Sequence, residues 1–588
     1  MRNLNIFFLI PIVLFSFYGC ENLITPEEDN HSTVEQTYKD PAWAEGLLMT
    51  AYAKIPTNSL TFSEVATDDA VTNNKLNNYL RMATGEWSAL FNPVSQWDNC
   101  NSAILYLNNF LTIVDTVKWK WTNSAINSMY AKRLKGEAYA LRGLFEYHLL
   151  QTIGGTGKDN KMLGIPIYTK FIDDTDNFNV SRATFSESVL QIYSDLDKAL
   201  EYLTMDDYKD ITSVTQLPSE MEGISITDYN SVFGLRTNQR ISGRIVKALK
   251  ARVALLAASP AFSDNDASLW EKAAKYAGAS IIGIGGISGL DPNGHKFFDQ
   301  TRVDAIKLAS NIDQKEMVWR RPLVVSNNRE MENFPPSLYG NGTVNPTQNL
   351  VDAFPMANGY PINDLVNSKY NPLNPYTGRD PRLALYIVYN GSMMKNVVIK
   401  TGIGGGNDAK DSIQTSTRTG YYLRKLLRED VNLTPTAVTT KNHYEVHMRY
   451  TELFLIYAEA ANEAWGPDGK GDNEFSAREA IAAIRKRAGI TQPDNYLTSI
   501  TSKDEMRKLI RNERRLELCF EGFRFWDLRR WKADLTEAAK GININKANTT
   551  FSVIEIEPRA FKNVFMHSGP IPYNEVIKYN ALIQNKGW

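Results

Sequence analysis

The sequence predicts a mainly α-helical protein whose paired helices form a scaffold with long loop-rich insertions and a few short β-hairpins. Apolar residues recur at helical spacing in the first half and in the last quarter of the chain. Small residues stand where such helices would approach one another closely. The intervening stretches are rich in Pro, Gly and Asn, which favour turns and loops.

The helices are predicted from apolar side chains spaced at i, i+3 and i+4. Thr184 and Glu187 have the spacing of a capping box at the start of one helix. On these grounds we expect helices over residues 131–151, 184–203, 243–259, 268–277, 449–464, 477–488, 503–517 and 523–531. Their pairing resembles a tetratricopeptide-like scaffold, although no fixed-period repeat is visible.

Irregular insertions separate these helices, at residues 60–98, 152–182, 204–241, 279–447 and 532–575. Insertions of such length inside a compact protein are usually functional or disordered. Strand-like runs at residues 383–389 and 396–400 predict small hairpins within the longest one.

The first residues have the layout of an export signal. Arg2 supplies one positive charge, residues 4–18 are almost wholly apolar, and a Gly-Cys pair follows. The apolar run is shorter than the ~20 residues of a spanning helix, and Pro11 interrupts it. A transmembrane anchor is therefore the weaker alternative to a signal peptide over residues 1–19.

Cys20 is the predicted lipidation site. A small residue followed by Cys at the end of an apolar run resembles a bacterial lipobox, with Phe17 where Leu is usual. Each buried methylene contributes ~0.8 kcal/mol, so acyl chains on Cys20 would hold the protein at a bilayer. Residues 20–40 begin with this cysteine and continue as a polar, acidic stretch that we interpret as a flexible tether.

Charge and composition narrow the class of ligand. The net charge is −1, from 65 basic and 66 acidic residues, which gives no electrostatic footprint for nucleic acid. A disulfide between Cys100 and Cys519 is formally possible, but the apolar neighbours of Cys519 favour a buried thiol. The 28 Tyr, 25 Phe and 11 Trp supply flat faces on which an uncharged sugar ring can stack.

No segment of the sequence carries a complete catalytic or metal motif, and no cofactor or metal is predicted. His443 and His447 stand four apart, but Tyr444 occupies the position where a zinc protease needs Glu. We interpret them as loosely exposed histidines. The Gly-rich residues 283–289 and 402–406 lack the pattern of a phosphate loop. Carboxylate pairs for glycoside hydrolysis meet only in space, so a hydrolase stays open.

Residues 507–531, RKLIRNERRLELCFEGFRFWDLRRW, combine an amphipathic helix, a break at Gly522 and a second helix. This segment resembles the signature of the SusD/RagB family. We interpret it as a structural helix-turn-helix with ion pairs, each worth about 0.3–0.5 kcal/mol if exposed. On this interpretation it identifies the family without forming the binding site.

Further segments resemble the same family in the same order: residues 139–142, 164–166, 346–354, 449–463, 484–490 and 570–588. The resemblance covers nearly all of the chain beyond the tether. It implies one SusD-like domain over residues 41–588, with an N-terminal half over about 41–278 and a C-terminal half over about 279–588.

The resemblance also implies a function. Members of the family lie at the outer membrane as lids over a SusC-like, TonB-dependent transporter barrel, and bind oligosaccharides or, in some members, peptides. The chain is thus expected to be a cell-surface glycan-binding lipoprotein and not an enzyme. A peptide cargo, a hydrolase and an adaptor that binds only the barrel remain alternatives.

Sugar binding needs aromatic faces beside polar groups for the hydroxyls, and two loop regions have that mixture. The first, residues 68–99, contributes Asn77, Arg81 and Trp87. Ligand residues of the family often come from the equivalent loop, which favours Trp87. Trp97 begins a helical stretch and is assigned to packing instead.

The second loop region, residues 319–360, holds aromatic and polar residues among Pro and Gly. Fixed aromatic side chains lose little entropy on binding, which suits weak sugar contacts. The candidates from this region are Arg320, Phe334, Tyr339, Asn341 and Tyr360.

Overall fold

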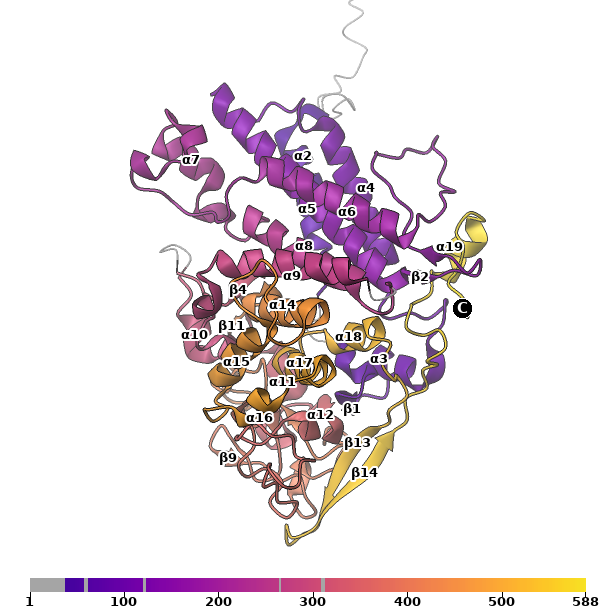
Figure 1. Ribbon diagram of the computed structural model, residues 1–588, viewed down its shortest axis with the longest axis vertical. Coiled ribbons are helices and arrows are strands. Elements are labelled where there is room, and N and C mark those ends of the chain that lie inside the picture. The colour runs from indigo at the N-terminus through magenta and orange to yellow at the C-terminus, as the bar shows by residue number, and fades with distance from the viewer. Residues whose placement is uncertain (1–37, 58–61, 120–122, 264–265, 308–311) are drawn as a thin grey trace, which may run out of the picture.

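The computed structural model describes residues 38–57, 62–119, 123–263, 266–307 and 312–588. The predicted signal peptide, Cys20 and most of the tether lie outside these residues. The described chain is mainly α-helical with short strand pairs, so the predicted fold class is confirmed. In Figure 1 the indigo and magenta helices form the upper part, and a loop-rich end lies below.

The longer helices form the scaffold: α2 Pro41–Ala53, α4 Trp97–Ile113, α5 Ser124–Ile153, α6 Phe185–Tyr202, α7 Ile226–Phe233, α8 Gly243–Ala258, α9 Ala267–Ile282, α14 Tyr450–Trp465, α15 Ala477–Ala488, α17 Lys503–Leu518 and α18 Arg524–Arg530. The shorter helices are α3 Asn78–Arg81, α10 Gln300–Asp304, α11 Asn328–Asn333, α12 Gln348–Ala353, α13 Pro381–Tyr386, α16 Asn495–Ser499 and α19 Tyr573–Lys578.

The described strands all pair antiparallel, two by two. The pairs are β1 Ala70–Thr72 with β6 Val344–Pro346, β2 Gly155–Thr156 with β3 Met162–Leu163, β4 Met317–Arg320 with β12 Val446–Arg449, β5 Val324–Ser326 with β11 Lys441–His443, β7 Ile387–Val388 with β10 Tyr422–Leu423, β8 Met393–Met394 with β9 Val397–Val398, and β13 Ala539–Ile544 with β14 Phe551–Glu557.

Each predicted helix is present, and two are longer than predicted. Helix α5 begins where Asn123 accepts a hydrogen bond from the Ala125 amide, ahead of the apolar pattern. Helix α9 continues past the predicted end at residue 277. The capping box forms as predicted, because Thr184 accepts from the Glu187 amide and Glu187 accepts from the Thr184 amide.

Small residues allow the helices to approach closely, as predicted. A Cβ atom at Gly136 of α5 would lie 2.7 Å from Leu203 Cγ, and one at Gly143 would lie 3.2 Å from Leu196 Cδ2. Helices α5 and α6 pack along these positions, while α14 packs on α9, α15 and α17. One large apolar core runs through both groups of helices, and Trp97 lies within it.

One predicted strand is wrong. Residues 383–389 were expected to be extended, but their first part completes helix α13 before strand β7. Asp380 caps this helix by accepting from the Arg382 amide, and Pro381 occupies its first turn. The short β-like run therefore lies inside a capped helix. The hairpin predicted at residues 396–400 is confirmed by β8 and β9.

The signature helices carry buried ion pairs, which corrects the expectation of exposed ones. Glu513 and Glu517 of α17 are fully buried, and the buried Arg382 guanidinium donates to both. Arg530 of α18 donates to both oxygens of Glu459 on α14, at 2.6 and 2.7 Å. The charges face inward because α14 and α13 pack against α17 and α18.

Cys100 and Cys519 are free and buried, so the prediction of a buried Cys519 is confirmed. Within the described ranges, no helix combines the length and the apolar character needed to cross a bilayer.

Candidate ligand-binding face and central cavity

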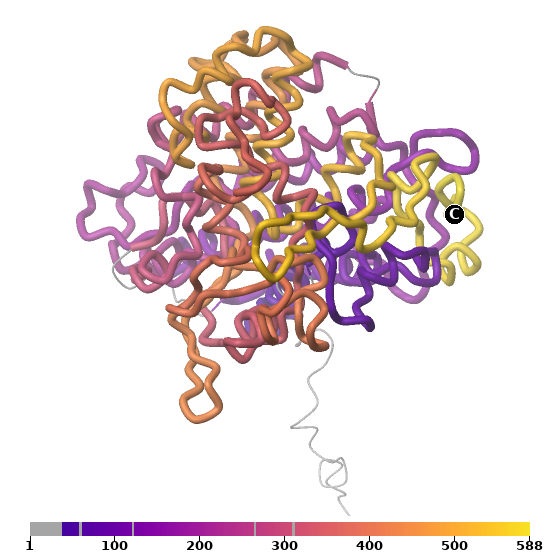
Figure 2. Tube along the Cα trace, turned by 90° about the horizontal axis from the view of Figure 1, so that it is seen from below, coloured from indigo at the N-terminus to yellow at the C-terminus, as the bar shows by residue number. Residues whose placement is uncertain are grey.

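The pairing of β1 with β6 brings the two predicted loop regions together. These strands join residues 70–72 to residues 344–346. Just after β1, the Asn73 side-chain amide donates to the carbonyl oxygens of Asn341 at 2.9 Å and Gly342 at 3.0 Å. Figure 2 shows the indigo segment that carries β1 among segments from the middle and the end of the chain.

Tyr339 is the exposed aromatic residue of this junction, with 57% of its surface accessible. Its backbone lies in the left-handed region, at a φ of 66°, and its amide donates to the Pro336 carbonyl. Such a conformation costs a non-glycine residue roughly 1–3 kcal/mol, and residues held there cluster at ligand sites. The ring is therefore presented to solvent from a fixed backbone.

Polar side chains occur in the loops of the same junction. Asn341 is exposed, and its amide donates to the Met331 carbonyl of α11. Asn77 caps α3, because its side-chain oxygen accepts from the Tyr79 and Leu80 amides. The structure thus brings the loops that carry Tyr339, Asn341 and Asn77 together at the junction of β1 and β6.

A third loop, residues 411–418, completes this surface and was not predicted. The Asn73 amide reaches the Ser416 carbonyl at 3.4 Å, and Arg418 donates to the Thr72 carbonyl at 2.9 Å. Only the tertiary fold places this loop beside the other two. We call the surface formed by residues 73–81, 331–343 and 411–418 the loop face.

Trp87 does not belong to the loop face, contrary to the prediction. Its ring is 4% exposed and packs against Phe525, Phe561 and Trp588. The indole N–H donates to Asn92 Oδ1 at 2.9 Å. The loop that carries Trp87 folds inward against α18 and the C-terminus, so the ring is a core residue and offers no stacking surface.

Arg320 and Phe334 are also buried, which corrects their predicted exposure. The Arg320 guanidinium forms an ion pair with Asp313 at 2.8 Å and lies over the Tyr444 ring. Phe334 has no accessible surface and belongs to a small apolar core beneath α11.

Arg81 and Tyr360 lie nearer the surface but have other partners. Arg81 pairs with Glu86 at 2.6 Å and covers the Phe91 ring. Tyr360 is half-buried and contacts the Tyr496 ring, whose centroid lies 5.4 Å away. The Tyr360 ring is thus engaged by another aromatic side chain of the protein.

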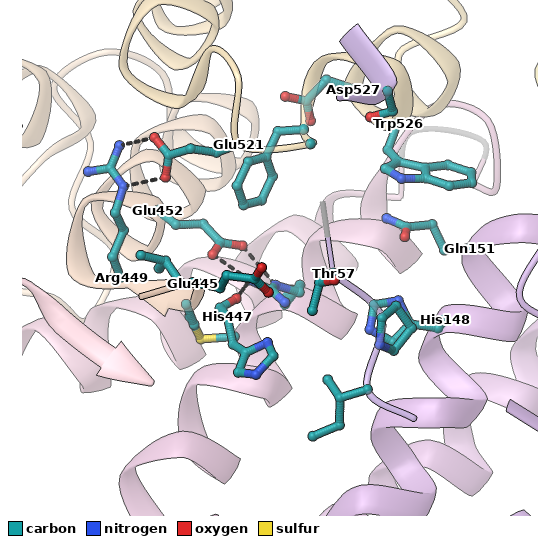
Figure 3. A pocket seen from close by; sticks show the side chains of 18 of the residues that line it. Thr57, His148, Gln151, Glu445, His447, Arg449, Glu452, Glu521, Trp526 and Asp527 are labelled. Carbon is teal, nitrogen blue, oxygen red and sulfur yellow. Dashed lines mark hydrogen bonds and ion pairs between the residues drawn. The ribbon is translucent and has the colours of Figure 1, made fainter. Parts of the chain in front are cut away.

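A separate cavity of about 220 Å³ lies between α5 and α8 on one side and α14, α17 and α18 on the other. Figure 3 shows His148 and Gln151 of α5 and Trp526 of α18 on one side of this space, and Glu445 and His447 on the other. We call it the central cavity. Its residues come from segments that are remote in sequence, so no local pattern pointed to it.

His447 lines the central cavity and is half-buried, which corrects the prediction of a loosely exposed residue. Burial, together with the nearby Arg321 and Arg252 charges, lowers the pKa of His447 to about 3. His443 is buried as well, and its Nε2 lies 3.3 Å from Glu330 Oε2. Strands β11 and β12 fold these residues into the protein.

The carboxylates of the central cavity are paired with arginines. Arg252 donates to both oxygens of Glu452, at 2.8 and 2.6 Å. Burial alone would raise the pKa of Glu521, but the charges of Arg449 and Lys425 outweigh it and hold the pKa below its usual range. A glycosidase acid needs a raised pKa, so Glu521 does not fit that role.

Among the described residues, no group of three or more His, Cys, Asp or Glu side chains is arranged to hold a metal ion.

Two family models match the chain in succession. The model described as "Starch-binding associating with outer membrane" matches residues 27–220, and the model described as "SusD family" matches residues 308–588. The curated relatives that match are SusD-like proteins P38 and P2 of Formosa agariphila, 37% and 36% identical over 98 and 144 residues. These matches span 17% and 24% of this chain, and only 18% and 25% of the relatives.

Solved structures share the fold over almost the whole chain. A SusD-like protein from Bacteroides fragilis is 23% identical, with a TM-score of 0.71, and the match covers 95% of this chain and 99% of that one. A laminarin-binding SusD-like protein is 19% identical, with a TM-score of 0.56, over 94% of this chain and 100% of that one. These structures share the fold, and the two successive family matches place the chain in the SusD/RagB family.

Proposed function

We propose that this protein is a cell-surface lipoprotein that binds an oligosaccharide at the loop face and delivers it to a SusC-like, TonB-dependent transporter of the outer membrane. The observation that carries the proposal is the exposed Tyr339 ring, held in a left-handed conformation beside Asn341. The laminarin-binding relative and the starch-binding family description support a glycan as the ligand.

The chemistry of the loop face suits a sugar. The Tyr339 ring offers a flat apolar surface for one face of a pyranose, and its hydroxyl remains able to hydrogen-bond. Exposed polar side chains at Lys75, Asn78 and Asn341 lie in the surrounding loops, where they can reach ligand hydroxyl groups. Such a shallow face favours weak, repeated contacts with a chain of sugars.

The anchor and the partner are part of the same proposal. Residues 1–19 act as a signal peptide, Cys20 carries the lipid, residues 20–40 form the tether and residues 41–588 form the SusD-like domain. Replacing Cys20 with Ala should move the protein from the membrane pellet to the soluble fraction. Recovery of a TonB-dependent barrel with the tagged wild-type protein would support the partner, and its absence from such preparations would contradict it.

The central experiment is calorimetric titration of the mature protein with a panel of oligosaccharides. Tyr339→Ala should weaken binding about tenfold, which corresponds to about 1.4 kcal/mol. Tyr573→Ala is the matched control, since Tyr573 is also exposed, at 48%, but lies on α19 away from the loop face. Equal losses in both variants would contradict the proposed site.

The alternatives give different results in the same preparations. A peptide cargo would appear as binding to a peptide library with no glycan bound. A hydrolase would release new reducing ends from the glycans. A pure adaptor would form a complex with the barrel and bind neither kind of ligand.

A further inference from the structure

The central cavity contains polar atoms that the protein itself does not satisfy. Arg514 is 3% exposed and donates through Nε to Asp527, while its buried Nη1 has no partner among the described residues. Glu445 Oε2 is likewise buried and accepts no hydrogen bond from the described residues, and its ion-pair partner Arg321 lies 3.8 Å away. Leaving such a group unpaired costs about 1–3 kcal/mol, so these atoms indicate that a ligand binds in the cavity.

The imidazoles of the cavity add further unused hydrogen-bonding capacity. No described group hydrogen-bonds the ring nitrogens of His148 or His447, although both residues line the cavity. Burial and the charge of Arg252 lower the pKa of His148 to about 3, so its ring is neutral near pH 7. A neutral imidazole offers one N–H donor and one nitrogen acceptor.

Most charged groups of the wall are paired within the protein, and Arg329, for which the described residues give no ion pair, donates to the Tyr444 carbonyl. Arg252 is paired with Glu452, and Arg530 is paired with Glu459 and Asp527. A ligand with a net charge would therefore compete with these existing partners and would be desolvated at a high cost. The unsatisfied atoms include both donors and acceptors, and hydroxyl groups serve both roles.

The volume and the walls of the cavity limit the kind of ligand that it can hold. Its volume of about 220 Å³ is below the roughly 300–1,000 Å³ of sites for drug-sized ligands. The Trp526 ring lies at one side of the space, opposite the polar groups around Glu445 (Figure 3). One flat apolar wall facing hydrogen-bonding groups matches a single sugar ring.

We propose that the central cavity is a second binding site, distinct from the loop face, for one small neutral polyhydroxylated molecule of about the size of a monosaccharide. The His148 and His447 rings, the free Arg514 nitrogen and Glu445 Oε2 hydrogen-bond its hydroxyl groups, and Trp526 covers an apolar face. This site does not depend on the proposed role of Tyr339, and the two sites have separate tests.

The test is ligand-detected NMR of the mature protein with glucose, galactose, mannose, xylose and arabinose, each offered singly. At least one sugar should give a saturable signal whose apparent Kd rises at least tenfold in His148→Leu and in His447→Leu. The signal should persist in Tyr339→Ala. His567→Leu is the matched control, since His567 lies outside the cavity and donates through Nε2 to the Ala533 carbonyl.

Two results would overturn the proposal. The first is a panel in which no sugar gives a saturable signal. The second is a signal that Tyr339→Ala removes while His148→Leu leaves it intact, because that would place the sugar on the loop face. If the cavity variants fail to fold, diffraction from wild-type crystals soaked with each sugar decides: ring-shaped density in the cavity supports the site, and ordered water alone refutes it.

Discussion

The loop face and the group of helices α14, α17 and α18 use polar side chains in opposite ways. In the helices, Glu459 and Arg530 are buried, and each satisfies the other. On the loop face, Tyr339 and Asn341 turn toward solvent, and mainly backbone hydrogen bonds hold their positions. The difference teaches that the most recognisable residues of the chain specify the scaffold, whereas the least patterned ones are available to a ligand.

The largest effect should come from breaking a buried pair. Glu459→Ala removes the carboxylate to which both terminal Arg530 nitrogens and the Trp531 indole donate, and should lower the free energy of unfolding by about 3–5 kcal/mol. Urea denaturation measures this loss. Glu86→Ala is the control, because Glu86 forms an exposed pair with Arg81, and its unfolding midpoint should hardly change.

Acid should weaken the same pair. Burial alone would raise the pKa of Glu459, but Arg530 outweighs it and holds the pKa at about 2. This stability is present above the unfolded-state pKa and is lost as the pH falls from about 5 to about 2. In Glu459→Gln, the loss of unfolding free energy between about pH 5 and pH 2 should be smaller by roughly 3 kcal/mol, as measured by urea denaturation at each pH. An unchanged pH profile would show that other groups dominate.

A substitution at Trp87 tests whether this residue belongs to the core or to the binding face. Because its ring lies in the core with Phe525 and Phe561, Trp87→Leu should cost about 2–3 kcal/mol of stability. The fraction that remains folded should bind glycan with unchanged affinity. Weakened binding with full stability would return Trp87 to the binding site.

The smallest effect concerns the backbone of Tyr339. Tyr339→Gly and Tyr339→Ala both remove the ring, so both should weaken glycan binding to the same extent. The glycine variant should be about 1 kcal/mol more stable than the alanine variant, because a left-handed conformation costs an L-residue roughly 1–2 kcal/mol. Equal melting temperatures would mean that the loop relaxes when the ring is removed.

Local patterns predicted the scaffold well and the site poorly. The apolar spacing and the capping box of Thr184 and Glu187 are properties of neighbouring residues, so the sequence reveals them. Whether an aromatic residue in a loop is exposed depends on what folds over it. Tyr339 and Phe334 lie five residues apart in one loop, yet one is 57% exposed and the other is fully buried.

The junction of β1 and β6 determines when the loop face can form during synthesis. Asn73 and Asn341 are 268 positions apart in the chain, so the loop face forms only after a very long loop has closed. During synthesis the helices from α2 to α9 emerge before residue 341 and contain much of their own packing. A truncated chain that ends before β6 would retain those helices and have no loop face. The loop face can therefore form only after residues 411–418 have been added to the chain.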